Sequence, residues 1–78
     1  MREVVSISIE LERTETGVDA TGAFELSGKT YRVNAHAPEN HRDHRIAHDL
    51  AVARVMRGLE LELMEWIHEH IDRYIADE

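Results

Sequence analysis

The stretch from Tyr31 to Met56 reads YRVNAHAPENHRDHRIAHDLAVARVM, and the spacing of its apolar residues changes near Asp43. Before that point apolar and polar residues alternate; after it, apolar residues recur every three or four positions. A period of two is typical of a half-buried strand, and a period near 3.6 is typical of an amphipathic helix. The chain is therefore predicted to be an α+β domain of β-β-β-α order. We expect a three-stranded antiparallel sheet with one long C-terminal helix across one face.

The expected strands cover about residues 4–12, 18–26 and 29–36. The pair Ser27-Gly28 suits a two-residue hairpin turn, because glycine readily adopts a positive φ. Closing the turn there pairs Leu26 with Lys29, and the rest of the register follows. On the inner face the expected pairs are Phe24 with Tyr31, Gly22 with Val33, and Ala20 with Ala35. Gly22 is expected to leave room on that face for a bulky helix residue, or to mark a bulge.

The expected helix covers about residues 44–76, with Asp43 as its N-cap. Its apolar residues cover more than half of the helix circumference, whereas one contact face needs a stripe of little more than ~100°. About 33 helical residues also span ~50 Å, which exceeds the ~30 Å of a nine-residue strand. The excess predicts a homodimer whose interface includes Leu63, Trp66, Ile67, Ile71 and Tyr74. The alternative is a helix that bends at Gly58 and folds back on its own sheet.

The composition limits the class of protein. The 78 residues carry a net charge of −7 and contain no cysteine, so disulfides and thiolate metal sites are excluded. Such a small domain buries a limited core, and domains of this size often associate for that reason. No apolar run is long enough for a signal peptide or a membrane span, so we expect no membrane partner and a cytoplasmic location. The acidic balance argues against nucleic-acid binding over the whole surface.

Histidines are frequent around the predicted start of the helix. His44 and His48 are four residues apart, so both rings can lie on one helix face. With His41 as a third ligand they form a weak candidate for a zinc site or a site for another imidazole-seeking ion. The same region is a candidate RNA-binding patch, which comprises His41, Arg42, His44, Arg45 and His48. His70 lies within the apolar arc of the helix. One hypothesis places it at an interface, where its protonation would make association pH-sensitive; the favoured expectation is a partly buried, hydrogen-bonded histidine.

Signatures of catalysis are missing from the sequence. There is no nucleophile and base at plausible spacing, and the four scattered glycines do not form a phosphate-binding loop. We therefore expect a protein without enzymatic activity and without a cofactor.

Two resemblances add to these expectations. The β-β-β-α order and the segment His44-Arg45-Ile46-Ala47-His48 resemble the C-terminal part of a double-stranded-RNA-binding domain, in which cations of the last helix bind phosphates. The loop Ala37-Pro38-Glu39-Asn40 and the helix segment from Asp49 to Met56 resemble a family of small actinobacterial proteins of unknown function with a dsRBD-like fold. That resemblance implies a ribosome-linked or stress-linked role, a dimer and no enzymatic activity.

These observations lead to three hypotheses of function. The first is a non-enzymatic interaction protein that self-associates through the surplus apolar surface of its helix. The second is an RNA-binding or ribosome-binding module that uses the patch at the start of the helix. The third is a histidine metal-binding protein.

Overall fold

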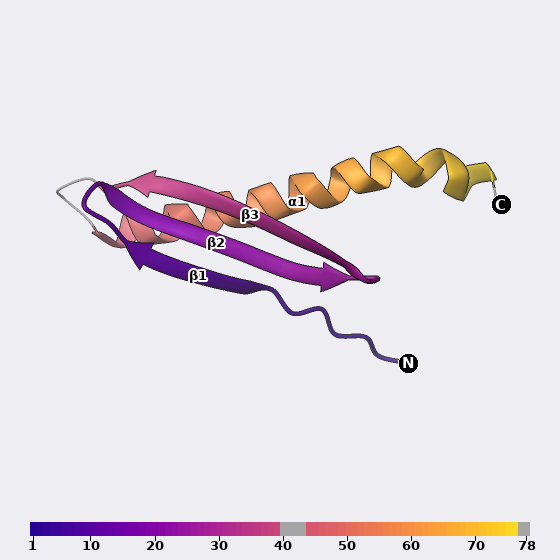
Figure 1. The fold of residues 1–78 in the computed structure, drawn as a ribbon, viewed down its shortest axis with the longest axis horizontal. Helices are drawn as coiled ribbons and strands as arrows, with labels where there is room; N and C mark the ends of the chain where they lie inside the picture. The colour runs from indigo at the N-terminus through magenta and orange to yellow at the C-terminus, as the bar shows by residue number, and fades with distance from the viewer. Residues whose placement is uncertain (40–43, 77–78) are drawn as a thin grey trace.

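A three-stranded sheet and one long helix make up the fold (Figure 1). The computed structural model describes residues 1–39 and 44–76, and it describes side chains for residues 1–39 and 45–72. The elements are β1 (Ser8–Arg13), β2 (Gly17–Leu26), β3 (Lys29–Pro38) and α1 (His44–Ala76). The sheet is antiparallel with the order β1-β2-β3, and α1 crosses one of its faces. The predicted β-β-β-α arrangement is confirmed.

The hairpin of β2 and β3 has the register that its turn predicts. Leu26 pairs with Lys29, and the pairing continues to Gly17 opposite Pro38. The two turn residues, Ser27 and Gly28, have φ angles of 53° and 80°. Two positive φ values in a two-residue loop are typical of a type I′ turn, whose twist matches that of the flanking strands. The turn therefore determines which side chains of both strands face the helix.

The first strand is shorter than its hydrophobic pattern suggests. Pairing with β2 runs from Ser8 opposite Ala23 to Arg13 opposite Val18. The strand thus begins at Ser8 rather than near Val4, and Val5 and Ile7 are exposed. Figure 1 shows the N-terminal segment leaving the sheet. Alternation describes which residues could share a face, but a strand also needs a partner along its whole length, and here the pairing stops at Ser8.

The core lies between the inner face of the sheet and one line of helix residues. Ala47, Ala51, Val55 and Leu59 are spaced by four and are all buried. Most of these side chains are small, so the helix axis can approach the sheet closely. The sheet contributes five buried residues: Val18, Ala20, Phe24, Tyr31 and Ala37. The rings of Phe24 and Tyr31 stack with their centroids 4.9 Å apart.

Two glycines, one in each layer, allow two valines to pack into the opposite layer. A Cβ atom on Gly22 of β2 would lie 2.2 Å from Val55 Cγ1 of α1. A Cβ atom on Gly58 of α1 would lie 2.5 Å from Val33 Cγ1 of β3. Both distances are far below van der Waals contact, so only glycine fits at either position. The expectation that Gly22 accepts a bulky helix residue is confirmed, and that residue is Val55.

The helix continues through Gly58 without a break and extends well beyond the end of the sheet (Figure 1). Its 33 residues face strands of 10 residues or fewer, and the longest dimension of the molecule is 54 Å. The glycine that could have bent the helix instead contacts β3. Within the described residues, α1 has no stretch with the length and hydropathy needed to span a membrane.

We predict that Gly22→Ala lowers the free energy of unfolding by about 1–3 kcal/mol, because the new methyl group overlaps Val55. In the double variant Gly22→Ala/Val55→Ala the methyl group occupies space that the valine vacates. The two changes should therefore cost less together than the sum of the single changes, by about 0.5–3 kcal/mol. Urea denaturation of the unchanged protein, Gly22→Ala, Val55→Ala and the double variant measures the four free energies of unfolding that give this difference. Simple additivity would mean that the two residues do not contact each other.

Candidate functional site

The part of α1 after Leu63 carries an apolar patch, and its first residue, Trp66, also lines a hollow with Leu26 and Tyr31 of the β2–β3 hairpin. Among the helix residues with described side chains, Leu63 is the last one packed against the core. After it, Trp66, Ile67, His70 and Ile71 line a shallow hollow of about 380 Å³. We call these four residues the overhang patch. Four of the five residues predicted for a dimer interface, namely Leu63, Trp66, Ile67 and Ile71, therefore lie at or beside this hollow. The side chain of the fifth, Tyr74, lies outside the described side chains.

His70 is held in place by two contacts with Trp66. The two rings stack with centroids 4.3 Å apart and an angle of 20° between their planes. His70 Nδ1 lies 2.8 Å from the backbone oxygen of Trp66. A carbonyl oxygen can only accept a hydrogen bond, so Nδ1 carries the proton and donates it. The prediction that His70 is partly buried and hydrogen-bonded is confirmed. The ring adds flat apolar surface to the patch while its polar nitrogen is occupied.

Other apolar side chains of α1 are exposed as well, and one of them, Met56, lines an apolar hollow with Val5, Ile7 and Phe24 beside the sheet. Ile46, Met56 and Leu61 are each more than half exposed, at 62%, 54% and 57%. Leu50 and Met64 are exposed as well. Exposed apolar side chains that form a contiguous patch often mark a contact surface. The number of exposed apolar side chains on this helix makes it a candidate for such a surface.

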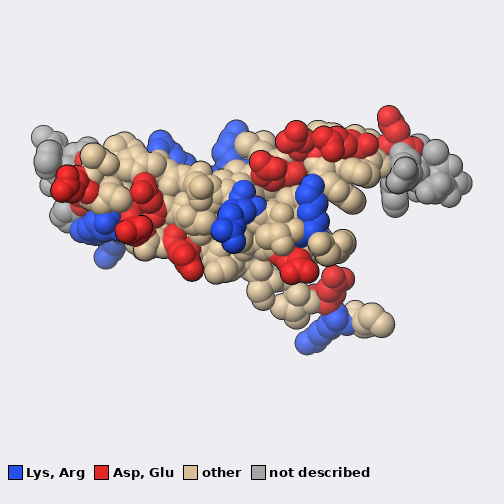
Figure 2. All heavy atoms as spheres, in the orientation of Figure 1, with Lys and Arg blue, Asp and Glu red and all other residues tan. Residues whose placement is uncertain are grey.

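An acidic strip borders the overhang on its other side. Glu62, Glu65, Glu69 and Asp72 are all exposed and are spaced by three or four residues, so they share one face of the helix. Figure 2 shows acidic side chains gathered along one edge of the C-terminal half of α1. This strip repels other anions and favours water. The overhang thus has one wet face and one apolar face.

The predicted RNA-binding patch is described only in part. His41 and Arg42 lie outside the described residues, and so does the expected N-cap Asp43. The helix begins at His44, as predicted, but its side chain lies outside the described side chains. Arg45 and His48 are exposed, and His48 Nδ1 is 3.1 Å from the carboxylate of Asp49. A carboxylate beside the imidazole competes with a phosphate for it. RNA or ribosome binding by these residues stays a prediction.

The predicted metal site has a similar status. Within residues 1–39 and the described part of α1, no group of three or more histidine, aspartate or glutamate side chains is arranged to hold a metal ion. Of the three predicted ligands, only His48 has a described side chain, and it contacts Asp49. Metal binding by His41, His44 and His48 is therefore still a prediction.

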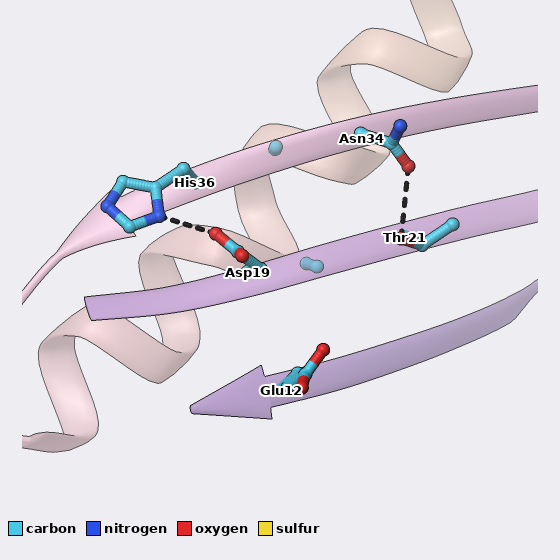
Figure 3. A pocket seen from close by; sticks show the side chains of 7 residues that line it. Glu12, Asp19, Thr21, Asn34 and His36 are labelled. Carbon is cyan, nitrogen blue, oxygen red and sulfur yellow. Dashed lines mark hydrogen bonds and ion pairs between the residues drawn. The ribbon is translucent and has the colours of Figure 1, made fainter. Parts of the chain in front are cut away.

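The structure also brings together a polar row that the sequence analysis missed (Figure 3). Glu12, Asp19 and His36 are register partners on three neighbouring strands and lie on the outer face of the sheet. His36 Nδ1 and Asp19 Oδ1 are 2.5 Å apart, with the imidazole donating to the carboxylate. In the adjacent row, the Thr21 hydroxyl donates to the amide oxygen of Asn34 over 3.0 Å. These residues line a shallow depression.

The chemistry of this row favours a surface network over a catalytic site. The Thr21 hydroxyl is the one potential nucleophile among the residues that line the depression, and it donates its proton to Asn34 rather than to His36. Side chains of His36 and Asp19 remain 43% and 53% exposed, so water competes for their hydrogen bond. An exposed pair of this kind contributes at most about 1 kcal/mol to stability. The expectation of no enzymatic activity stays a prediction, since none of these observations is a test of activity.

Comparison of the chain with protein-family models, curated proteins and solved structures finds no match. The resemblances to the double-stranded-RNA-binding domain and to the small actinobacterial family therefore stay expectations.

We predict that His70→Leu increases the fluorescence of Trp66, because imidazole in ring contact quenches indole emission. Trp66 is the single tryptophan of the chain, so all indole emission comes from this residue. The matched control is His68→Leu, two residues away and on a different side of the helix. Equal emission from both variants and the unchanged protein would mean that Trp66 and His70 do not stack in solution.

Proposed function

We propose that this chain is a non-enzymatic interaction protein whose first partner is a second copy of itself. The observation that supports this is the unbroken helix α1, which is longer than its sheet and has several exposed apolar side chains. The self-association uses apolar surface of α1 that the sheet leaves uncovered. It includes Ile67 and Ile71 of the overhang patch.

The overhang needs a covering surface for physical reasons. Isolated helices shorter than about 12–15 residues are marginal in water, and helices in proteins gain most of their stability from packing an apolar face. The described side chains from Ile67 to Asp72 lie beyond Leu63, the last described helix residue packed against the core. Burying one large apolar side chain contributes about 1.5–3 kcal/mol relative to leaving it exposed. A partner that covers Ile67 and Ile71 therefore stabilises both the helix end and the complex.

The charge distribution supports a protein partner. An acidic strip runs along the overhang, and the net charge of the chain is −7. Both features oppose contact with nucleic acid backbones and with anionic membranes. A second copy of the chain can place its apolar face against this one while both acidic strips stay in water. The proposal therefore assigns the overhang to contact between copies.

We predict that the untagged protein is a dimer at micromolar concentration and that Ile71→Ser weakens it at least tenfold. The matched control is Glu69→Ser, which introduces the same residue in the same turn but on the acidic strip. Both variants carry serine at the changed position, so the helix propensity of the new residue is the same in each. A larger loss of dimer in Ile71→Ser than in Glu69→Ser therefore reports on burial of Ile71. Native mass spectrometry and light scattering at two concentrations measure the populations. A monomeric unchanged protein at micromolar concentration would overturn the proposed function.

A further inference from the structure

We propose that two copies pair antiparallel along the outer face of α1, with Arg57 of each copy facing Glu60 of the other. This inference rests on the proposed self-association and specifies its geometry. The pairing surface is called the outer seam below. It comprises eight positions, which are Ile46, Leu50, Ala53, Arg57, Glu60, Met64, Ile67 and Ile71.

The spacing of the outer seam is that of a coiled coil. Successive positions are separated by four, three, four, three, four, three and four residues, which is the alternation of heptad core positions. Seven of the eight side chains are exposed, and Ile67 is half-buried. The residues that face the sheet, such as Ala51 and Val55, fall between seam positions. Between Ile46 and Ile71, within the helix residues whose side chains are described, the seam therefore follows side chains that the chain leaves largely exposed.

A twofold axis midway between Arg57 and Glu60 matches the seam with itself. It places Ala53 opposite Met64 and Leu50 opposite Ile67 of the second copy. It also places Ile46 opposite Ile71. A symmetric dimer needs this kind of self-complementarity, in which a residue and its counterpart exchange places across the axis. A shallow hollow lined by Ala53, Met56, Arg57 and Glu60 lies beside the small Ala53 side chain, where the long Met64 of the second copy would pack.

The charges at the centre of the seam select the antiparallel orientation. In a parallel pair with this seam in register, Arg57 would face Arg57 and Glu60 would face Glu60. Like charges facing each other at the centre of an apolar contact repel and disfavour that pairing. In the antiparallel pair each Arg57 meets a Glu60, so both contacts are attractive. One oppositely charged pair per copy therefore favours one orientation over the other.

The acidic strip is compatible with this pairing. Glu62, Glu65 and Glu69 each lie two residues from a seam position, and residues two apart point about 200° apart around a helix. When the seams of two copies meet, both strips point away from the contact and remain in water. Like-charge repulsion between the copies is thus kept low, in spite of the net charge of −7 on each chain.

The charge test uses Arg57→Glu, Glu60→Arg and the double variant that carries both changes. Each single variant places like charges opposite each other and should weaken the dimer at least tenfold. The double variant exchanges the two charges, restores both attractive contacts and should dimerise within about threefold of the unchanged protein. Sedimentation velocity measures association, and circular dichroism of each protein verifies that the helix is kept. Single variants that associate as tightly as the unchanged protein would overturn the proposal.

The orientation test uses cysteines, which the natural chain lacks. An equimolar mixture of Ala53→Cys and Met64→Cys should form a disulfide-linked heterodimer on mild oxidation, because the two positions face each other. Ala53→Cys alone should stay uncrosslinked, since its thiol faces Met64 of the second copy. Rapid formation of a disulfide-linked homodimer by Ala53→Cys alone, with no more heterodimer than homodimer in the mixture, would indicate parallel pairing. That result would overturn the proposal.

The outcomes separate this inference from the proposed function on which it rests. A monomeric unchanged protein overturns both. A dimer that persists in Arg57→Glu and in Glu60→Arg, but dissociates in Ile71→Ser or Trp66→Ser, overturns the outer seam and keeps self-association through the overhang patch. A dimer that is lost in both charge variants and regained in the double variant supports both.

Discussion

The reciprocal packing of two glycines and two valines determines how the helix lies on the sheet. Gly22 and Val33 are register partners on β2 and β3, and Val55 and Gly58 lie one turn apart on α1. Val55 fills the space over Gly22, and Val33 fills the space over Gly58. Each layer thus supplies one projection and one gap at the same place. A shift of the helix along the sheet would bring a valine against a backbone that cannot yield, so the position of α1 is specified at this point.

This packing also involves Gly58, the residue at which the helix could otherwise bend. A glycine within a helix lowers helix propensity by about 1 kcal/mol relative to alanine, and a bend at Gly58 would have allowed the helix to fold back. Contact with Val33 holds the helix straight at that residue instead. A straight helix of 33 residues on strands of at most 10 must then extend past the sheet. The uncovered apolar surface of α1 is therefore a consequence of how the core is packed.

The sequence predicted the fold where local chemistry determines it. Ser27-Gly28 set the hairpin register, and the register placed Gly22 on the face that receives the helix. The start of β1 was harder to predict because Val5 and Ile7 alternate in the same way as Ile9 and Leu11, although only the later residues have a paired partner strand. The contact of Asp19 with His36 could have been found, since it follows from extending the predicted hairpin by one more pair. The position of Glu12 beside them could not, because it depends on the register across the loop between β1 and β2.

The helix shows a different limit of prediction. A helical wheel identifies surplus apolar surface, but it treats the sheet-facing side and the outer side alike until the sheet position is known. Once Ala47, Ala51, Val55 and Leu59 are placed against the sheet, the apolar residues of the helix that stay exposed, such as Ile46 and Ile71, can be identified. Hydrophobicity alone does not identify a partner for this surface, because apolar contact has no preferred direction.

In the proposed antiparallel dimer, Arg57 and Glu60 provide the direction that apolar contact lacks. Two aliphatic residues at these positions would make the outer face of α1 uniformly apolar, and such a face can pair in either orientation and in more than one register. Charged residues within an apolar contact usually lower the stability of an assembly relative to well-packed aliphatic ones, and they can in return specify its geometry. One arginine and one glutamate per chain are enough to specify the orientation, because the twofold axis of the proposed dimer repeats their contact and gives two ion pairs. The same two charges also interrupt the apolar surface along this exposed face of the helix.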